Sequence, residues 1–238
     1  MAEPSYEILL SGFPGRTPRG FLGWSTTVLL HTRDGHALFD TGGAGDRPGV
    51  LDALARRGLT PTDIRTVVLS HLHFDHVANV ECFPKAEVVL HETELAYFDE
   101  HKADDRAIPL FQVEGLLRSP QLSLVSGELD VLPGIRMIRT PGHTGGHASL
   151  VLSIEGKCVV LAQDAIKHRG EIETQTSVGA FDAAAAKASI QRIAGMADVV
   201  VPGHDAPLHV SNSKVVAAGT LSEVISLSLE DRCFVMEI

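Results

Sequence analysis

Short apolar runs, rich in β-branched residues and bounded by glycine, proline or other turn residues, recur along the chain and predict β-strands. The predicted strands are residues 6–10, 26–31, 36–40, 66–69, 86–90, 122–125, 135–138, 149–154, 157–162 and 199–201. The pair Asp34-Gly35, between the second and third of these runs, suits a tight hairpin turn. Strands are therefore expected from near the start of the chain to about residue 201.

Helical patterns lie between these runs. Apolar residues at helical spacing predict helices over residues 48–57 and 92–101. A third helix is predicted over residues 182–194, with Asp182 as its N-cap and Gly195 just past its end. The mixture of strands and helices predicts an α/β fold.

Length and continuity predict one domain over residues 1–238. No linker or low-complexity segment divides the chain. Residues 102–120 carry no readable pattern. Residues 215–238 are apolar enough to pack on a sheet or to form the surface of a homodimer, and the sequence leaves both readings open.

The composition of the chain limits the classes of partner that it is expected to bind. Thirty acidic against 20 basic residues give a formal net charge of −10, which disfavours nucleic acid because phosphate backbones need a basic surface. A small-molecule substrate is expected instead. The first residues resemble no signal peptide, no apolar run is long enough to cross a bilayer, and the three cysteines lie far apart. We therefore expect a cytoplasmic protein without a membrane partner.

The strongest chemical signal is a cluster of four candidate metal ligands directly after the strand 66–69, namely His71, His73, Asp75 and His76. Alternating residues of an extended segment point the same way, so His71 and His73 can reach one ion together. Asp75 and His76 lie beyond the turn and can face a second point nearby. Two adjacent ions can share these four ligands more easily than one tetrahedral ion. Imidazole and carboxylate donors without thiolates suit zinc, iron or manganese.

Three later loops add ligands, each after a predicted strand. His143 lies in a glycine-rich loop, Asp164 ends a strand, and His204 follows Pro-Gly. A carboxylate has two oxygens, so Asp164 can bridge two ions. His147 is expected to be buried or to support the site rather than to bind metal. Asp40, at another strand end, is expected to accept a hydrogen bond from a ligand ring.

The order HxHxDH, PGHTGGH, a strand-end Asp and PGHD resembles the metallo-β-lactamase superfamily, and the resemblance covers residues 40–204. It implies a four-layer αβ/βα sandwich with the site at one edge. It implies a dinuclear centre in which His71, His73 and His143 hold the first metal, Asp75, His76 and His204 hold the second, and Asp164 and a hydroxide bridge them. The implied reaction is attack by this hydroxide, with two divalent metal ions, zinc first and manganese or iron as alternatives, and Asp75 as a proton shuttle.

Within that superfamily the motifs look most like N-acyl-homoserine lactonases and related lactonases. Asp164 argues against true β-lactamases, which typically lack it. The expected substrate is thus a small lactone or ester, such as a quorum-sensing N-acyl-homoserine lactone. Four apolar residues are candidates for the lip of an acyl pocket, or else pack on the protein's own sheet: Phe13, Phe21, Leu22 and Trp24.

One position departs from the lactonase pattern. Those enzymes carry a tyrosine three residues after the bridging aspartate, where this chain has Lys167, followed by His168. Either residue can serve as the electrophile in place of the tyrosine. The catalytic candidates are therefore Asp75, Asp164, Lys167 and His168.

Two other enzyme classes stay open. Residues 76–84 and 197–204 also resemble small family members linked to phosphodiester or nucleic-acid cleavage. An iron persulfide dioxygenase keeps the HxHxDH loop but uses one iron, and His76 and His204 are then not ligands. The identity and number of the metals separate these readings.

Overall fold

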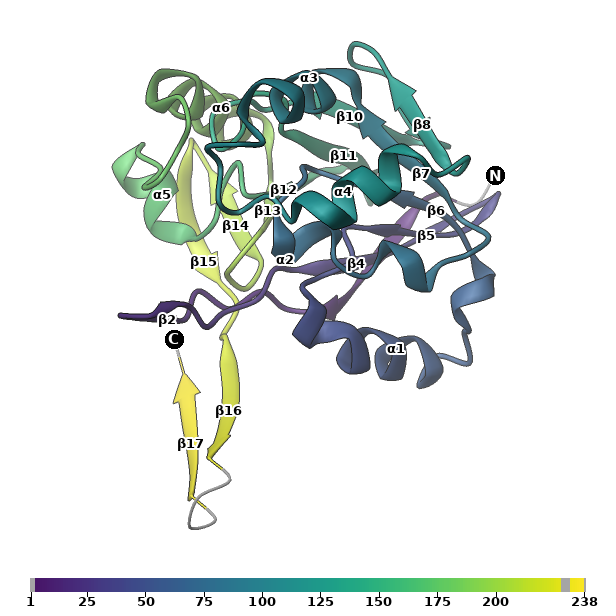
Figure 1. Ribbon diagram of the computed structural model, residues 1–238. Helices are drawn as coiled ribbons and strands as arrows, with labels where there is room; N and C mark the ends of the chain where they lie inside the picture. Colours follow the sequence, from purple (N-terminus) through teal and green to yellow (C-terminus); the bar gives the residue numbers. More distant parts are fainter. Residues whose placement is uncertain (1–2, 228–231, 238) are drawn as a thin grey trace.

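The computed structural model describes residues 3–227 and 232–237, and in this part of the chain two large β-sheets form the centre of the molecule (Figure 1). The first sheet has the strand order β1-β4-β5-β6-β7-β8. Its strands are β1 (Ser5–Leu10), β4 (Thr27–Thr32), β5 (Gly35–Phe39), β6 (Ile64–Val68), β7 (Glu87–His91) and β8 (Leu122–Val125). The pairs from β5 to β8 are parallel, whereas β1, β4 and β5 are antiparallel.

The second sheet has the strand order β15-β14-β13-β12-β11-β10-β9. Its strands are β9 (Asp130–Leu132), β10 (Ile135–Arg139), β11 (Ala148–Ile154), β12 (Lys157–Gln163), β13 (Val199–Pro202), β14 (Leu208–Ser211) and β15 (Lys214–Ala218). β12 and β13 pair in parallel, and their neighbours are antiparallel.

The two sheets pack face to face because alternate side chains of each strand point to opposite faces. In β4, Val28 and Leu30 belong to the apolar cluster shared with Leu150 and Leu161 of the second sheet. Leu29 lies between them in sequence and belongs to a separate cluster on the outer face. The period of two thus builds one core between the sheets and a second core outside the first sheet.

Helices cover the outer face of each sheet (Figure 1). The α-helices are α1 (Arg47–Ala55), α2 (Phe74–Val77), α3 (Glu92–His101), α4 (Leu110–Leu117), α5 (Arg169–Thr174) and α6 (Ala183–Met196), and short 3₁₀ turns are η1 (Ala44–Asp46), η2 (Pro61–Asp63) and η3 (Val80–Cys82). Leu54, Phe98 and Val113 of α1, α3 and α4 pack on the first sheet. Ile190 and Ile193 of α6 pack on the second. The layers are therefore helix, sheet, sheet, helix, and the α/β prediction is confirmed.

The predicted helix start at Asp182 is confirmed. Its Oδ1 atom accepts hydrogen bonds from the backbone N–H groups of Ala184 and Ala185 at 2.9 and 3.0 Å. The predicted end is wrong by two residues, since α6 runs to Met196 and Gly195 lies inside it. The backbone N–H of Ala197 still donates into the last turn, so this glycine does not stop the helix.

The unreadable segment 102–120 contains α4, and the last part of the chain divides in two. Within residues 215–238, the start belongs to β15 at the edge of the second sheet. β16 (Ser222–Leu227) and β17 (Arg232–Glu237) form a separate hairpin that extends away from both sheets (Figure 1). Residues 228–231 and 238 lie outside the described part. Among the described helices, none is both long and apolar enough to cross a bilayer.

Candidate metal centre

The candidate ligands follow strands that end at one edge of the two sheets. Residues 71–76 follow β6, the His143 loop (residues 140–147) joins β10 to β11, Asp164 follows β12, and His204 follows β13. β10 runs in the same direction as β12 and β13, because β10 and β12 both pair antiparallel with β11. The C-terminal strand ends therefore bring these loops together, as in other α/β sites.

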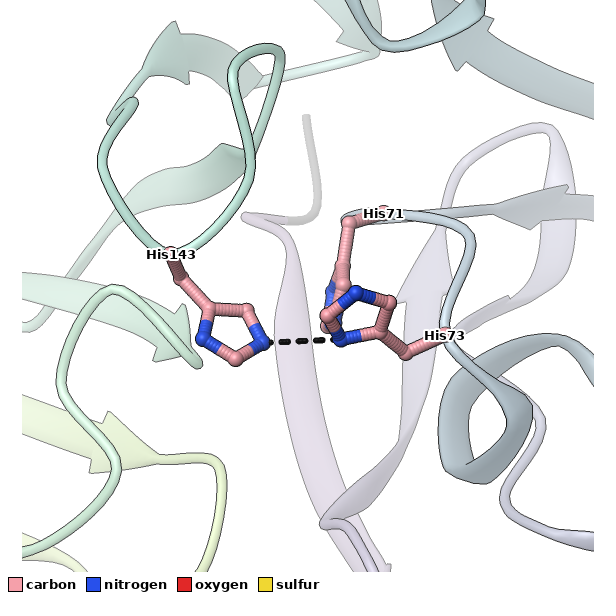
Figure 2. A group of neighbouring side chains, drawn as sticks. All are labelled: His71, His73 and His143. Atoms are coloured by element: carbon pink, nitrogen blue, oxygen red, sulfur yellow. Dashed lines mark hydrogen bonds between the residues drawn. The ribbon is translucent and has the colours of Figure 1, made fainter. Parts of the chain in front are cut away.

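The first ligand group contains His71, His73 and His143, whose ligand atoms lie within 4.8 Å of one another. The three rings converge from two loops on opposite sides of the centre (Figure 2). His143 Nε2 lies 3.0 Å from His73 Nδ1. His71 Nε2 is buried without a hydrogen-bond partner among the described residues. Three nitrogens aimed at one point, one of them unpartnered, suit a metal ion.

The second ligand group contains Asp75, His76 and His204, again within 4.8 Å. Asp164 lies between the groups. Its Oδ2 atom is 3.2 Å from His143 Nε2, and its Oδ1 atom is 3.2 Å from His204 Nε2 and 3.4 Å from His76 Nε2. One carboxylate therefore faces both groups with different oxygens, as a bridging ligand requires.

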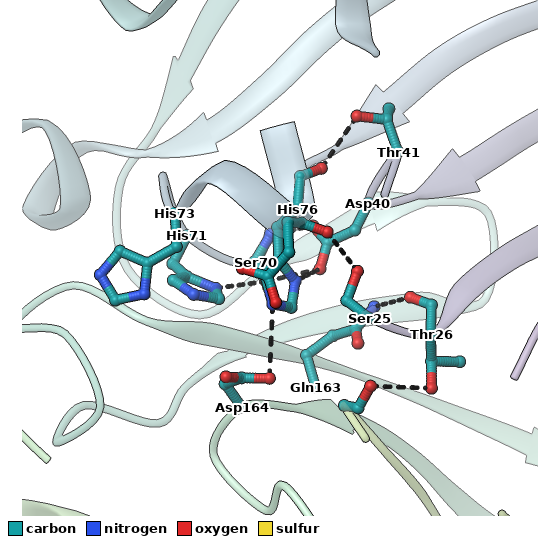
Figure 3. A network of polar contacts seen from close by, with 12 residues as sticks. Ser25, Thr26, Asp40, Thr41, Ser70, His71, His73, His76, Gln163 and Asp164 are labelled. Atoms are coloured by element: carbon teal, nitrogen blue, oxygen red, sulfur yellow. Dashed lines mark hydrogen bonds and ion pairs between the residues drawn. The ribbon is translucent and has the colours of Figure 1, made fainter. Parts of the chain in front are cut away.

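In four of the five ligand histidines, a protein group contacts the ring nitrogen that faces away from the centre, and Figure 3 draws the network around His71 and His76. His143 is the exception, since its Nδ1 atom is buried without a partner among the described residues. Asp40 Oδ2 lies 2.7 Å from His76 Nδ1 and also accepts a hydrogen bond from Ser70 Oγ at 2.6 Å. The same hydroxyl lies 2.9 Å from His71 Nδ1. His204 Nδ1 lies 2.8 Å from the backbone oxygen of Trp24. Such partners fix the ring orientation and leave the other nitrogen for a metal.

At His71, His143 and Asp164 the surroundings favour the protonation states that metal binding requires. Burial lowers the pKa of His71 and of His143 well below the usual range, so both rings are neutral. Burial alone raises the pKa of Asp164, but the surrounding histidines outweigh it and hold this pKa well below its ordinary value. Burial also lowers the pKa of His76, yet the carboxylates of Asp75, Asp164 and Asp40 raise it well above normal. A cation at this centre would replace that proton.

Glycine is required at position 203. A Cβ atom there would lie 2.1 Å from Asp164 Oδ1, far inside van der Waals contact. The Pro-Gly-His sequence thus lets the backbone approach the bridging carboxylate while it presents His204 on the next residue.

Lys167 and His168 occupy different environments beside the centre. Lys167 Nζ lies 3.2 Å from Glu171 Oε1 and donates to Ser177 Oγ at 2.7 Å and to the Val178 backbone oxygen at 3.0 Å. Two protein oxygens therefore accept hydrogen bonds from this ammonium, and the Glu171 carboxylate pairs with its charge. His168 is half-buried, and its ring makes no side-chain hydrogen bond within residues 3–227.

A cavity of about 750 Å³ opens over the centre. Four of its lining residues are aromatic carbocycles: Phe21, Phe74, Tyr97 and Phe181. Polar and charged residues line it as well, among them Arg16, His101, Asp104, Lys167 and His168. Of the predicted lip, Phe21 lines this cavity. Phe13 does not, because it is buried and stacks on Trp24 at 5.0 Å between ring centroids, and Leu22 is exposed outside the cavity.

Comparison with known families agrees with this geometry. The model of the metallo-beta-lactamase superfamily matches residues 22–204. The chain belongs to this superfamily. This match confirms the resemblance and the fold class that the motifs predicted. The superfamily and its lactonase relatives indicate that the protein is a metal-dependent hydrolase.

Its relatives include both mammalian and bacterial proteins. The chain is 32% identical over 223 residues to metallo-beta-lactamase domain-containing protein 1 of Mus musculus, covering 90% of this chain and 78% of the relative. It is 29% identical over 161 residues to an N-acyl homoserine lactonase of Bacillus sp., covering 66% and 62%. A solved quorum-quenching N-acyl homoserine lactone hydrolase superposes with a TM-score of 0.63 at 25% identity, covering 80% of this chain and 85% of that structure.

Two residues near the centre of this superfamily member escaped the sequence analysis. Asp105 Oδ2 lies 2.9 Å from His73 Nε2 and accepts a hydrogen bond from Tyr97 Oη at 2.8 Å. Glu94 is buried between the two loops that carry the first ligand group. Neither lies in a motif, so only the folded chain reveals them. His147 is buried behind the ligands, with Nδ1 2.9 Å from Thr140 Oγ1.

Proposed function

We propose that the protein is a dinuclear hydrolase of small lactones or esters, such as an N-acyl-homoserine lactone. The observation that carries the proposal is the Asp164 carboxylate, which lies within 3.4 Å of ring nitrogens from both ligand groups. We infer two divalent ions, zinc first and manganese or iron as alternatives, since the donors are imidazole and carboxylate. The ions would lower the pKa of water toward neutrality and polarise the substrate's carbonyl oxygen.

The chain's own groups then have distinct tasks. His71, His73 and His143 would hold one ion, Asp75, His76 and His204 would hold the other, and Asp164 would serve both. Asp75 also lines the cavity, where its carboxylate can receive a proton and pass it to the leaving group. Asp40 keeps the His76 ring aimed at the centre through its 2.7 Å contact.

We further propose that His168, rather than Lys167, contacts the substrate's polar group. Both residues line the cavity. The Lys167 ammonium donates to Ser177 and Val178 and forms an ion pair with Glu171, so this side chain holds the cavity wall in place. The ring of His168 keeps its nitrogens for a ligand.

The cavity supports a substrate with an apolar part. Phe21 and Phe74 stand on one side with ring centroids 6.1 Å apart, and Tyr97 and Phe181 form another aromatic pair at 5.0 Å. An acyl chain that covered the exposed faces of Phe21, Phe74 and Phe181 would remove apolar surface from water and so gain free energy. The net charge of −10 also favours a neutral substrate over a polyanion.

The test is a hydrolysis assay on protein loaded with zinc or with manganese, using a panel of acyl-homoserine lactones, simple esters and a small phosphodiester. We expect lactone or ester hydrolysis with kcat/KM above ~10⁴ M⁻¹s⁻¹, the low end for natural substrates. The Asp164→Asn variant should lose both activity and metal content. Inert lactones and esters in a protein that binds two metals would overturn the substrate assignment.

A phosphodiesterase is the second candidate, favoured by one observation. Arg16, His101 and His168 line the same cavity and offer donors to a phosphate group. Phosphodiester turnover with inert lactones would select it. A mononuclear iron dioxygenase is less well supported, because it leaves His76 and His204 without the role that their convergence on Asp164 suggests.

A further inference from the structure

Glu94 is a buried carboxylate that joins the two loops of the first ligand group. It lies in α3, is 1% exposed, and has no ion-pair partner within the described residues. Burying a carboxylate without a cation is costly unless hydrogen bonds compensate. Its neighbours therefore have to explain why a charged residue stands here.

Both carboxylate oxygens are used, and each serves a different loop. Oε1 accepts a hydrogen bond from the backbone N–H of Leu72 at 3.0 Å, in the residue between His71 and His73. Oε2 accepts from Thr144 Oγ1 at 2.6 Å and from the Gly146 backbone N–H at 3.1 Å, in the His143 loop. All three donors lie within three residues of a ligand of the first group.

The contact between the His143 loop and α3 is also sterically close. A Cβ atom at residue 146 would lie 2.1 Å from the Glu94 backbone nitrogen. The glycine lets this loop, which belongs to the second sheet, rest directly on a helix of the first. Glu94 thus stands where the two halves of the sandwich meet.

We propose that Glu94 is a positioning residue that sets the distance between His143 and the pair His71 and His73. The proposal rests on the metal centre described above, since these three histidines form its first ligand group. A single rigid carboxylate fixes both loops at once. Without this carboxylate, the two loops are no longer held at a fixed distance from each other. The protein then binds the first ion less tightly.

The second ligand group has a different tie between the sheets. Thr26 donates its backbone N–H to the Gly203 oxygen at 2.7 Å, and its own backbone oxygen accepts from Gln163 Nε2 at 3.0 Å. These contacts do not involve Glu94. A change at Glu94 is therefore expected to act on the first ion and to spare the second.

The test compares Glu94→Gln with Glu92→Gln in the full chain. Glu92 lies on the same helix, is exposed, and accepts only from the Ser126 hydroxyl among the residues described. The amide of Glu94→Gln keeps the shape but turns one acceptor into a donor facing an N–H or O–H group. Metal content and affinity are measured by competition with a chromophoric chelator, and the visible spectrum of the cobalt(II)-loaded protein reports the ligand geometry.

We expect Glu94→Gln to lower the affinity for one of the two ions by about 10–100-fold, as for other groups that orient metal ligands. The substitution should also change the spectrum of the cobalt-loaded protein. Glu92→Gln should match the wild type. Thr144→Val removes one donor and should shift affinity the same way by less, which keeps the test open if Glu94→Gln does not fold. Unchanged affinity and spectrum in a folded Glu94→Gln, even with a lower melting temperature, would overturn the proposal. A wild-type protein that binds no metal would instead overturn the proposed function.

Discussion

Four of the five ligand histidines contact a protein group with one ring nitrogen and turn the other toward the centre, whereas His143 Nδ1 has no partner among the described residues. The sequence predicted which histidines gather, because the HxHxDH spacing is local and the later loops follow strand ends. It also predicted that Asp40 holds a ligand ring, which the contact with His76 confirms, but it did not predict the groups that hold the other rings. Asp105 and His73 are 32 residues apart, and Asp105 lies in the segment without a readable pattern. Contacts of this kind depend on how loops fold back, which periodicity does not report.

Lys167 and His168 are proposed to have different roles, which the sequence left open: His168 contacts the substrate, and Lys167 supports the cavity wall. We expect His168→Gln to lower kcat/KM on the true substrate by ~1–3 kcal/mol of transition-state binding, with an unchanged melting temperature, because its ring makes no hydrogen bond to the described residues.

Lys167→Gln is the matched comparison. It breaks the contact with Glu171 and loosens the wall around Val178, so a lower melting temperature should accompany its kinetic loss. Steady-state kinetics and thermal unfolding of both variants check this. A stable Lys167 variant with the larger kinetic loss would reverse the assignment.

At the scale of elements, a helix could be predicted where its sequence carries an N-cap residue. Asp182 caps α6 through two backbone hydrogen bonds, and this start was readable. α4 was missed because its sequence, LFQVEGLL, is apolar on most sides and has no side-chain cap. Phe111 in α4 is 89% exposed, so the pattern of apolar and polar residues does not show which face of this helix is buried. The C-terminal hairpin β16–β17 was also not foreseen, because its strands pair only with each other in the described chain.

An ion pair fastens α6 to the turn before β9, and it predicts a pH effect. Arg192 contacts both carboxylate oxygens of Glu128, at 2.5 and 2.8 Å. Hydrogen bonds from Arg192 lower the pKa of Glu128 from about 4.5 to about 2. A lowered folded-state pKa means that the pair stabilises the fold above pH 4.5 and loses this contribution as the pH falls toward 2.

The Glu128→Gln variant tests this effect. Because both side chains are partly exposed, the free energy of unfolding should fall by about 1 kcal/mol or less near neutrality. The difference from wild type should vanish on acidification. Urea unfolding at several pH values measures it, and a difference independent of pH would refute the ion-pair explanation.

At the scale of the whole molecule, the centre is assembled from both sheets. The segment that follows β6 brings four of the ligands, and the second sheet brings His143, Asp164 and His204. The motifs predicted this layered fold through the family resemblance rather than through periodicity. The single domain over residues 1–238, the homodimer and the cytoplasmic location stay predictions.

Ligands drawn from both sheets predict that bound metal stabilises the whole fold. Binding to the folded state alone adds about 4 kcal/mol per site when free metal exceeds the dissociation constant about 1,000-fold. Removal with a chelator should therefore lower the melting temperature, and added zinc should restore it. Calorimetry with and without chelator checks this, and an unchanged melting temperature would argue against ligands that tie the two halves together.

The walls of the cavity come largely from segments that hold no ligand. Arg16 and Phe21 belong to the short hairpin of β2 (Arg16–Thr17) and β3 (Gly20–Phe21), while Val178 and Phe181 belong to the stretch before α6. The stretch before α6 is tied to the His143 loop, because the Phe181 backbone N–H donates to the His143 oxygen at 3.3 Å, whereas the β2–β3 pair is hydrogen-bonded within itself. The hairpin is therefore the part of the wall that we expect to tolerate exchange. The chain is therefore suited to loop grafting. Variants of the wall segment can be selected for new substrate specificity while the candidate metal ligands stay unchanged.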